Sequence, residues 1–269
     1  MSYDKQQSQA SEWDYFISAI MFYTRLPTPA NGQHSQEILN RSRKYFPVVG
    51  LIIACIGAIT FLISNTVFSI ELSIALSMLA TILATGAFHE DGFADSCDGL
   101  GGGWSTEQVL TIMKDSRVGT YATVGLIAIL SIKFLALVQL ASFSIGSFIA
   151  ALLISHTISR QLSSLTIEQF IYVQDIDQSK VKPITERHLS EPDRHFSYLT
   201  SAASAFVVLI LAEHISIVDV VLCCALAFAV QQAFARYTEK RIGGYTGDVL
   251  GAIQQLTEVS LYLFFLIFI

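Results

Sequence analysis

The sequence has few charged residues and no stretch rich in basic ones. Only 14% of its 269 residues are Asp, Glu, Lys or Arg, whereas 52% are hydrophobic and the mean hydropathy is +0.54. A soluble globular domain usually has about 25% charged residues. The net charge of −6 and the lack of a basic stripe argue against nucleic acid as a partner. The composition instead predicts a chain whose solvent is lipid.

The chain also lacks a cysteine motif and a secretory signal. Three of its four cysteines lie in apolar runs and the fourth stands alone, so no C-x-x-C metal or redox spacing occurs. The first eleven residues are polar and have neither the charged start nor the apolar middle of a signal peptide. Internal segments are therefore expected to direct membrane insertion. We interpret all four cysteines as packing residues, namely Cys55, Cys97, Cys223 and Cys224.

Apolar runs recur along the chain at lengths that can cross a bilayer. About 20 apolar residues span the roughly 30 Å of hydrocarbon as a helix. The pattern predicts an all-α fold, a polytopic transmembrane helical bundle of about seven spans that forms one integral membrane domain over residues 1–269. The second and fifth spans are short, and Gln254, Gln255 and Glu258 interrupt the seventh. The predicted spans are 48–70, 72–88, 118–141, 145–165, 198–212, 217–235 and 249–269.

The segment before the first span, residues 1–47, is expected to be cytoplasmic and interfacial, with the bundle filling 48–269. Within it, residues 13–26 mix aromatic and polar positions. That mixture is typical of an amphipathic helix that lies in the membrane surface. Pro27 and Pro29 end the predicted helix.

The basic residues fall in alternate connections between the predicted spans. Bacterial membrane proteins retain Lys and Arg on the cytoplasmic side. Seven crossings with a cytoplasmic N-terminus satisfy this rule, so we expect a multi-pass protein of a bacterial inner membrane whose polar motifs face the cytoplasm. The basic residues of these connections are Lys5, Arg25, Arg41, Arg43, Lys44, Lys114, Arg117, Lys180, Lys182, Arg187, Arg194, Arg236, Lys240 and Arg241.

Two basic residues fall inside predicted spans. Lys133 is expected to snorkel outward from its span. His156 and Arg160 are one helical turn apart, and either a buried partner or snorkelling would accommodate them.

Four carboxylates fall within nine residues where the second predicted span ends. If this stretch is helical, Asp91, Asp95 and Asp98 stand at i, i+4 and i+7 on one face. Like charges repel, and a divalent cation would compensate them. The competing interpretation is a solvated acidic face. We favour a site for Mg²⁺ or Mn²⁺ whose ligands are Glu90, Asp91, Asp95 and Asp98.

A glycine-rich segment, residues 99–103, follows the acidic stretch. Residues without a Cβ let a ligand approach the backbone closely. Ser105 and Gln108 then have capping-box spacing, which predicts a helix whose first amides can face an anion. A flexible turn between helices is the alternative. The residues assigned to a phosphate site are Gly101, Gly102 and Gly103.

Two more clusters complete the polar motifs. Lys114 and Arg117 are three residues apart, so on a helix they would share a face that suits a pyrophosphate, although membrane anchoring explains both cations equally well. The connection before the seventh span combines glycines, a hydroxyl, a carboxylate and cations on the same predicted side. Its substrate-binding candidates are Arg241, Gly243, Gly244, Thr246 and Asp248.

These clusters, in this order, resemble the family of adenosylcobinamide-GDP ribazoletransferases, also called cobalamin 5'-phosphate synthases. The resemblance rests on residues 22–27, 46–50, 89–103, 113–120 and 243–252. It implies a Mg²⁺-dependent membrane enzyme that joins adenosylcobinamide-GDP to α-ribazole or its 5'-phosphate and releases GMP. The residues to which it attaches importance are Glu90, Asp91, Asp95, Asp98, Lys114, Asp115, Arg117 and Asp248, of which Asp115 is expected to bind substrate.

The residue chemistry suits such a reaction. Attack of a ribose hydroxyl on a pyrophosphate needs neutralisation of charge on the phosphate oxygens. The three aspartates of the acidic stretch would hold the metal, and Glu90 would be either a further ligand or the base for the hydroxyl. The expected catalytic residues are Glu90, Asp91, Asp95, Lys114 and Arg117, of which the two cations would stabilise the departing GMP.

Two other functions compete with this interpretation. A CDP-alcohol phosphotransferase would carry D-G-x-x-A-R, whereas this chain reads Asp91-Gly92-Phe93-Ala94-Asp95. A divalent-cation transporter would place polar groups at the midplane and show an inverted repeat, which the sequence lacks. The sequence leaves open whether the chain forms a homo-oligomer.

Overall fold

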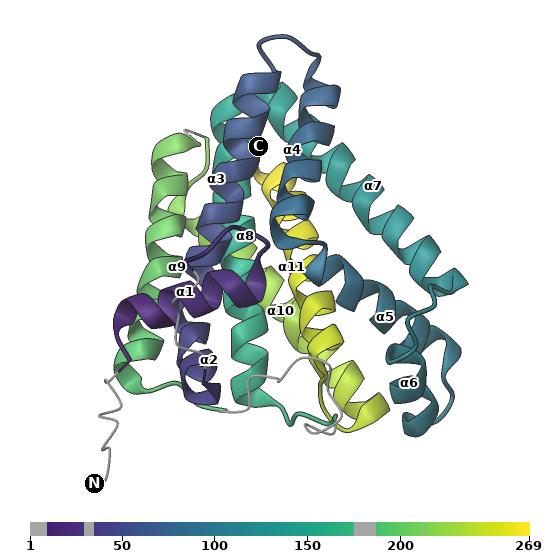
Figure 1. Ribbon diagram of the computed structural model, residues 1–269. Helices are drawn as coiled ribbons and strands as arrows, with labels where there is room; N and C mark the ends of the chain where they lie inside the picture. Colours follow the sequence, from purple (N-terminus) through teal and green to yellow (C-terminus); the bar gives the residue numbers. More distant parts are fainter. Residues whose placement is uncertain (1–9, 30–34, 175–186, 213) are drawn as a thin grey trace, which may run out of the picture.

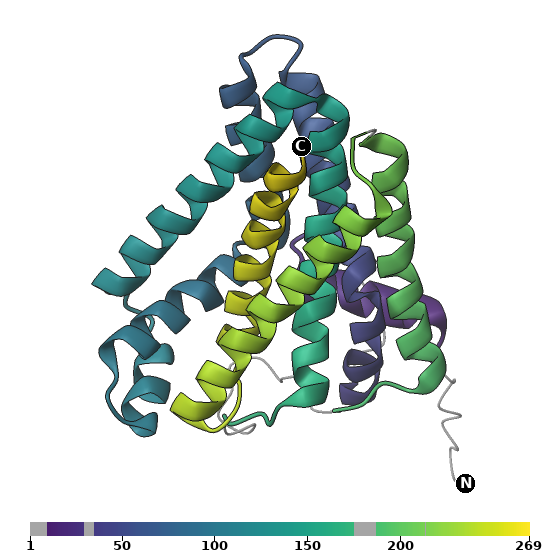
Figure 2. The same ribbon diagram turned by 180° about the vertical axis from the view of Figure 1, so that it is seen from behind.

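The computed structural model describes residues 10–29, 35–174, 187–212 and 214–269. Lys5, Lys180 and Lys182, which entered the charge argument, lie outside these ranges. The described chain is helical, and its one isolated bridge joins Tyr172 to Tyr245 (Figures 1 and 2). The elements are α1 (Glu12–Tyr23), α2 (Gln36–Ser42), the 3-10 turn η1 (Arg43–Tyr45), α3 (Phe46–Ser64), α4 (Ile70–Thr85), α5 (Phe88–Gly102), α6 (Thr106–Met113), α7 (Thr120–Phe143), α8 (Ile145–Gln169), α9 (Glu191–Leu211), α10 (Ile217–Ile242) and α11 (Gly247–Phe268).

The predicted all-helical membrane architecture is confirmed, whereas the count of seven spans stays a prediction. A helix lies at each predicted span, namely α3, α4 and α7 to α11. Within the described ranges, five helical segments are long and apolar enough to cross a membrane, or six if the bent pair α4 and α5 is one span. The five are Gln36–Ser64, Thr120–Phe143, Glu191–Leu211, Ile217–Ile242 and Gly247–Phe268.

Helix α8 is long but too polar to be among them. Its serines, His156 and Arg160 are buried because α8 packs against α3, α7, α9, α10 and α11. Close contact with α3 requires Gly50, where a Cβ would lie 2.3 Å from the carbonyl oxygen of His156. The polar side chains of α8 are therefore enclosed by other helices, which is where buried polar groups can find partners.

The chain turns sharply between α4 and α5. The two helix axes differ by 88°, and the residues at the turn, Gly86 and Ala87, have φ of 66° and 56°. The left-handed region is unfavourable for alanine by about 1–2 kcal/mol. The backbone N–H of Arg25 donates to the carbonyl of Ala84 at 2.7 Å, and the Arg25 side chain covers Gly86. The turn sends α5, with the acidic stretch, away from the axis of α4 (Figure 1).

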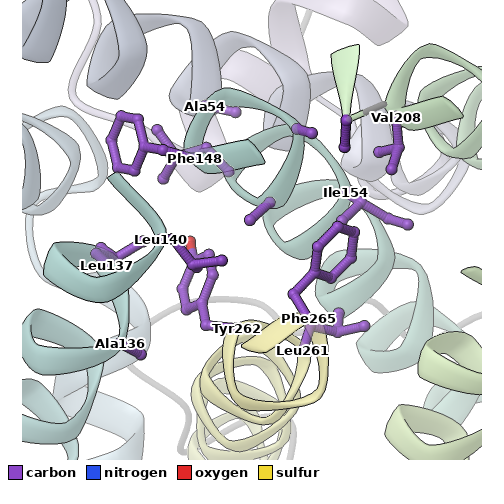
Figure 3. Close-up of a cluster of buried hydrophobic side chains, with 14 of the residues drawn as sticks. Ala54, Ala136, Leu137, Leu140, Phe148, Ile154, Val208, Leu261, Tyr262 and Phe265 are labelled. Carbon is purple, nitrogen blue, oxygen red and sulfur yellow. The ribbon is translucent and has the colours of Figure 1, made fainter. Parts of the chain in front are cut away.

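The largest hydrophobic cluster fills the space between α3, α7, α8, α9 and α11. Figure 3 shows Tyr262 of α11 pointing toward Leu140 of α7, and Phe265 lying beside Ile154 of α8. A second cluster lies under α1 and includes Tyr23 stacked on Phe46 with ring centroids 4.0 Å apart. Van der Waals contacts of this kind contribute to the packing of helices in a membrane.

Helix α1 crosses α3 (Figure 1). Ion pairs hold it against the bundle. A helix is present where residues 13–26 predicted one, but α1 ends at Tyr23, and its position at the membrane surface stays a prediction. The buried ammonium of Lys44 bonds Asp193 of α9 at 2.6 Å and Glu12 of α1 at 2.8 Å. Trp13 is exposed on the other side of α1. The segment before α3 is therefore packed against the helices that follow it.

The polar connections meet at one end of the bundle, which we call the acidic end. It comprises the ends of α5, α8 and α10, the starts of α9 and α11, and the whole of α6; the α3–α4 and α7–α8 turns lie at the opposite end (Figures 1 and 2). The three polar clusters thus gather at one end of the bundle, and their cytoplasmic placement stays a prediction.

Candidate functional site

The acidic stretch is helical, as the spacing predicted. Asp91, Asp95 and Asp98 lie on successive turns of α5. Their surroundings differ, because Asp91 is exposed, Asp95 is half-buried and Asp98 is buried. The three carboxylates therefore have to be considered one at a time.

Asp98 binds the start of α7. Its Oδ2 accepts the backbone N–H of Gly119 at 2.6 Å, and its Oδ1 accepts that of Ala122 at 2.9 Å. Gly119 has no room for a side chain, since a Cβ there would lie 2.6 Å from Asp98 Oδ1. A carboxylate at a helix N-terminus satisfies amides that the helix leaves unpaired and favours the helix dipole. Asp98 therefore caps the N-terminus of α7, a role that its spacing in the sequence did not indicate.

Asp91 lies near a carboxylate from another helix, Asp248 in the first turn of α11. The two side chains interact electrostatically and repel. The approach of α5 to α11 depends on glycines from both helices, because a Cβ on Gly92 would lie 2.9 Å from the Asp248 carbonyl and one on Gly251 would lie 3.0 Å from that of His89. Two acidic motifs that are far apart in the sequence thus meet at the acidic end.

Asp248 is held by neighbours in the connections. Thr246 Oγ1 donates to its Oδ2 at 3.4 Å, and the Gln174 side chain also bonds it. The predicted substrate-binding pair of Thr246 and Asp248 is therefore brought next to Asp91. Among the described residues, no three His, Cys, Asp or Glu side chains form a group that could hold a metal ion by themselves.

Glu90 points into the bundle. Its Oε1 accepts the side-chain amide of Gln255 at 3.1 Å, and its buried Oε2 has no hydrogen-bond partner in the described chain. Glu90 therefore has one oxygen held by Gln255 and a second, buried oxygen without a partner in the described chain, whereas its neighbour Asp91 is exposed.

The glycine-rich segment is not the open loop that its composition suggested. Helix α5 continues through Gly102, and the missing Cβ atoms allow packing. A Cβ on Gly99 would meet Met113, one on Gly101 would lie 2.7 Å from the Tyr121 ring, and one on Gly103 would meet Val109. The assignment of Gly101, Gly102 and Gly103 to a phosphate site is not tested by these contacts and stays a prediction.

Arg241 closes the end of α5. Its Nη2 donates to the carbonyl of Gly103 at 2.6 Å, and Thr106 Oγ1 donates to the Arg241 carbonyl at 3.0 Å. A cation at a helix C-terminus is favourable. The capping box predicted for Ser105 and Gln108 is confirmed at the start of α6.

Lys114 and Arg117 do not share a helical face, and that expectation is wrong. Helix α6 ends at Met113, because Asp115 folds the next residues into a turn. The Asp115 carboxylate accepts the backbone N–H of Arg117 at 3.0 Å and its guanidinium at 2.6 Å. This hydrogen bonding lowers the pKa of the exposed Asp115 carboxyl to about 2. Lys114 is exposed and makes no ion pair with a described residue.

The connection from α10 to α11 is a fixed turn. Gly243 has φ of +87° at the end of α10, a conformation that favours glycine. At Gly244 a Cβ would lie 2.0 Å from the Ile171 carbonyl, so only glycine permits the bridge in which Tyr245 N–H donates to that carbonyl at 2.9 Å. Thr246 then caps α11 through the Val249 N–H. These contacts alone explain why two glycines and a threonine occur in this turn, without a role in binding a ligand.

Sequence reasoning missed a charged cluster in the interior. Lys133 does not snorkel outward; it is 2% exposed and pairs with Glu258 of α11. His156 Nδ1 and Arg160 Nη1 lie 3.3 and 3.9 Å from the other Glu258 oxygen, so the buried-partner alternative is the correct one. The signal was present as Gln254 and Glu258, which stand one turn apart in an otherwise apolar helix.

The helices and the acidic end together define a multi-pass membrane protein with a polar site where its helices end. Comparison of the sequence with known protein families identifies the family. The chain belongs to the cobalamin-5-phosphate synthase family, whose model matches residues 15–266.

Curated relatives agree with this placement over nearly their whole length. The chain is 38% identical over 257 residues to the adenosylcobinamide-GDP ribazoletransferase of Shewanella amazonensis, covering 95% of this chain and 96% of the relative. It is 39% identical over 256 residues to the protein of that name from Vibrio cholerae, covering 95% and 94%, and 40% identical over 248 residues to that from Shewanella frigidimarina, covering 92% of each. No solved structure matches the chain.

Proposed function

We propose that the protein transfers the adenosylcobinamide phosphoryl group of adenosylcobinamide-GDP to α-ribazole or to α-ribazole 5'-phosphate. The ribose hydroxyl attacks the phosphorus on the cobinamide side, a new P–O bond forms, and the bond to GMP breaks. The products are GMP and adenosylcobalamin or its 5'-phosphate. Membership of the family over most of the chain supports the reaction, as do the names of its relatives.

The observation that carries the site assignment is the packing of α5 at Gly92 against the backbone of Asp248, which brings the Asp91 and Asp248 carboxylates near enough to interact electrostatically. Neither carboxylate forms an ion pair with a described residue, and they repel each other. Asp95 lies one turn along α5 from Asp91. Hard oxygen donors of this kind suit Mg²⁺ or Mn²⁺. One or two carboxylates from Asp91, Asp95 and Asp248 would therefore hold the ion, together with water and substrate phosphates.

The lack of a three-residue metal group in the described chain fits Mg²⁺, since proteins usually bind it through one or two carboxylates together with water and substrate phosphates. Asp98, with both oxygens bound to the start of α7, is less suited to be a ligand. When bound, the ion would neutralise charge on the pyrophosphate.

Two neighbouring side chains would act as the proton acceptor and as the cation that stabilises the leaving group. Glu90 takes the proton of the attacking hydroxyl on Oε2, because Oε1 is already held by Gln255. Lys114 is the cation best placed to accompany the GMP oxygens, since it has no ion-pair partner in the described chain, whereas Arg117 is bound to Asp115.

The proposed topology has seven crossings, by α3, α4 and α7 to α11, with the N-terminus and the acidic end in the cytoplasm of a bacterium and α1 at the inner-membrane surface. The concentration of basic residues in the connections at the acidic end supports this orientation. The polarity of α8 does not argue against a crossing, because other helices surround it.

The test is turnover by purified protein in detergent, with GMP and the corrinoid product separated by chromatography. We expect GMP release that needs both substrates, is abolished by EDTA and returns with Mg²⁺. Asp91→Asn and Asp248→Asn should each lower kcat by at least about 100-fold. Asp219→Asn is the matched control, because this carboxylate caps the start of α10.

The outcomes separate the parts of the proposal. Wild-type protein that releases no GMP from both substrates overturns the reaction, whereas release that persists in EDTA removes the metal alone. Magnesium flux into proteoliposomes without GMP release would favour a transporter.

A further inference from the structure

A row of hydrogen-bonded side chains runs through the interior and reaches Glu90. The Lys133 ammonium pairs with Glu258, and Glu258 Oε2 accepts the amide of Gln254. The oxygen of Gln254 accepts the amide of Gln255 at 2.9 Å, and Gln255 donates to Glu90 Oε1 at 3.1 Å. Four of the five residues are at most 2% exposed, and Glu90 is 8% exposed. We call these five side chains the interior row.

The interior row has a fixed direction. A glutamine side chain offers two N–H donors at one end and an acceptor oxygen at the other. The Gln254 amide nitrogen is engaged by Glu258 and by Ser159 Oγ at 3.1 Å, so its oxygen faces Gln255. Gln255 must then present its own nitrogen to two acceptors, Gln254 and Glu90. Reversing the Gln255 amide would set oxygen against oxygen at both contacts.

The Glu90 side chain needs a hydrogen-bond donor from another helix to fix its position. It lies in the first turn of α5, whose N-cap is the left-handed Ala87 and has no side-chain cap. Its other oxygen, Oε2, has no partner in the described chain. Within the described chain, the side-chain hydrogen bond that holds Glu90 comes from Gln255.

We propose that Gln255 is a positioning residue for phosphoryl transfer: it holds Glu90 Oε1 and leaves Oε2, which is buried in the absence of substrate, to meet the attacking hydroxyl when the substrates bind. Gln254, Glu258 and Lys133 keep the Gln255 amide in the donating orientation. This inference rests on the proposed function, in which Glu90 accepts the proton of the hydroxyl as the new P–O bond forms and GMP departs with the electrons of the broken one. Gln255 itself touches neither substrate nor metal.

The experiment is a double-mutant cycle on kcat. Gln255→Met removes the donor while keeping side-chain length. We expect it to lower kcat by about 10- to 100-fold, as supporting contacts of functional groups often do, and to leave KM for both substrates within about twofold. In a Glu90→Gln background the same change should have no further effect, because Gln255 would act through Glu90 alone.

A matched control is Gln231→Met. Gln231 is also a fully buried glutamine, but it lies on α10 and donates to Thr166 Oγ1 at 2.9 Å, in a network separate from the interior row. This variant should keep the wild-type kcat, and any small loss should be the same with and without Glu90→Gln. The comparison separates loss of a buried amide from loss of the contact to Glu90.

Each outcome decides a different claim. Wild-type kcat in Gln255→Met, or losses that multiply in the double variant, overturn the positioning role while the proposed function stands. A wild type without GMP release overturns both. If Gln255→Met does not insert, Gln254→Met is the second variant, because it removes the acceptor that orients Gln255; it should lower kcat without changing KM, and an unchanged kcat overturns the inference.

Discussion

Charged side chains in the interior of the bundle are arranged differently from those at the acidic end. In the interior, Lys133, His156 and Arg160 surround the single carboxylate of Glu258. At the acidic end, Asp91 meets a second carboxylate, Asp248, instead of a cation. The interior cluster pairs a carboxylate with cations, whereas the acidic end brings like charges together.

The contrast follows from access to solvent. A charge buried in a low-dielectric interior is tolerated only when it is paired and hydrogen-bonded. At the ends of the helices, water can hydrate a carboxylate and a bound cation can neutralise it, even where the protein provides no partner. The interior charges therefore stabilise the bundle and orient the row that leads to Glu90, and the carboxylates of the acidic end are the ones suited to hold a cation and phosphate.

The largest effect should come from breaking the interior cluster. Glu258→Leu leaves Lys133 and Arg160 buried without their carboxylate, which should lower the free energy of unfolding by about 3–5 kcal/mol. The measurement is the unfolding midpoint in a denaturing-detergent titration. The double variant Glu258→Leu with Lys133→Met should recover much of the loss, because fewer charges are then unpaired. Equal stability of the single and double variants would contradict this account of the cluster.

A smaller effect should separate two carboxylates of the same helix. Asp98→Ala removes the cap of α7 and should lower the free energy of unfolding by about 1–2 kcal/mol, in EDTA as well as in Mg²⁺. Asp91→Asn should not lower stability in EDTA, because it relieves repulsion with Asp248, and it should abolish the response of turnover to Mg²⁺. The unfolding midpoint and the Mg²⁺ dependence of kcat are measured for both. A stability loss in Asp98→Ala that occurs only with Mg²⁺ would make Asp98 a ligand after all.

The helices and their grouping at the acidic end could be predicted because they depend on local features. Apolar runs fix α3, α7 and α10, and the spacing of Ser105 and Gln108 fixes the start of α6. The acidic stretch was visible as carboxylates one turn apart. Each of these signals lies within a few residues of the structure that it determines.

The contacts that assign tasks to the residues could not be predicted in this way. Asp98 bonds an amide 21 residues later, and Glu90 bonds an amide 165 residues later. The left-handed Ala87 depends on packing around the turn rather than on a glycine. For the same reason Lys133 was misplaced, since its partner Glu258 lies on another helix. One sequence shows which groups are present but not which distant groups satisfy them.

The smallest effect should come from the exposed pair of Arg117 and Asp115, which uses the same chemistry as Lys133 and Glu258 but lies in water. Exposed ion pairs contribute little to stability, so Arg117→Ala should leave the unfolding midpoint at pH 7 unchanged. Because the Arg117 side chain lowers the pKa of Asp115 from its ordinary value of 3.8 to about 2, any contribution of the pair is fully present above about pH 4 and is lost as the pH falls toward 2. Unfolding midpoints of wild type and Arg117→Ala should therefore coincide from pH 5 to pH 8. A gap in that range would mean that the turn after α6 supports the bundle more strongly than an exposed pair can.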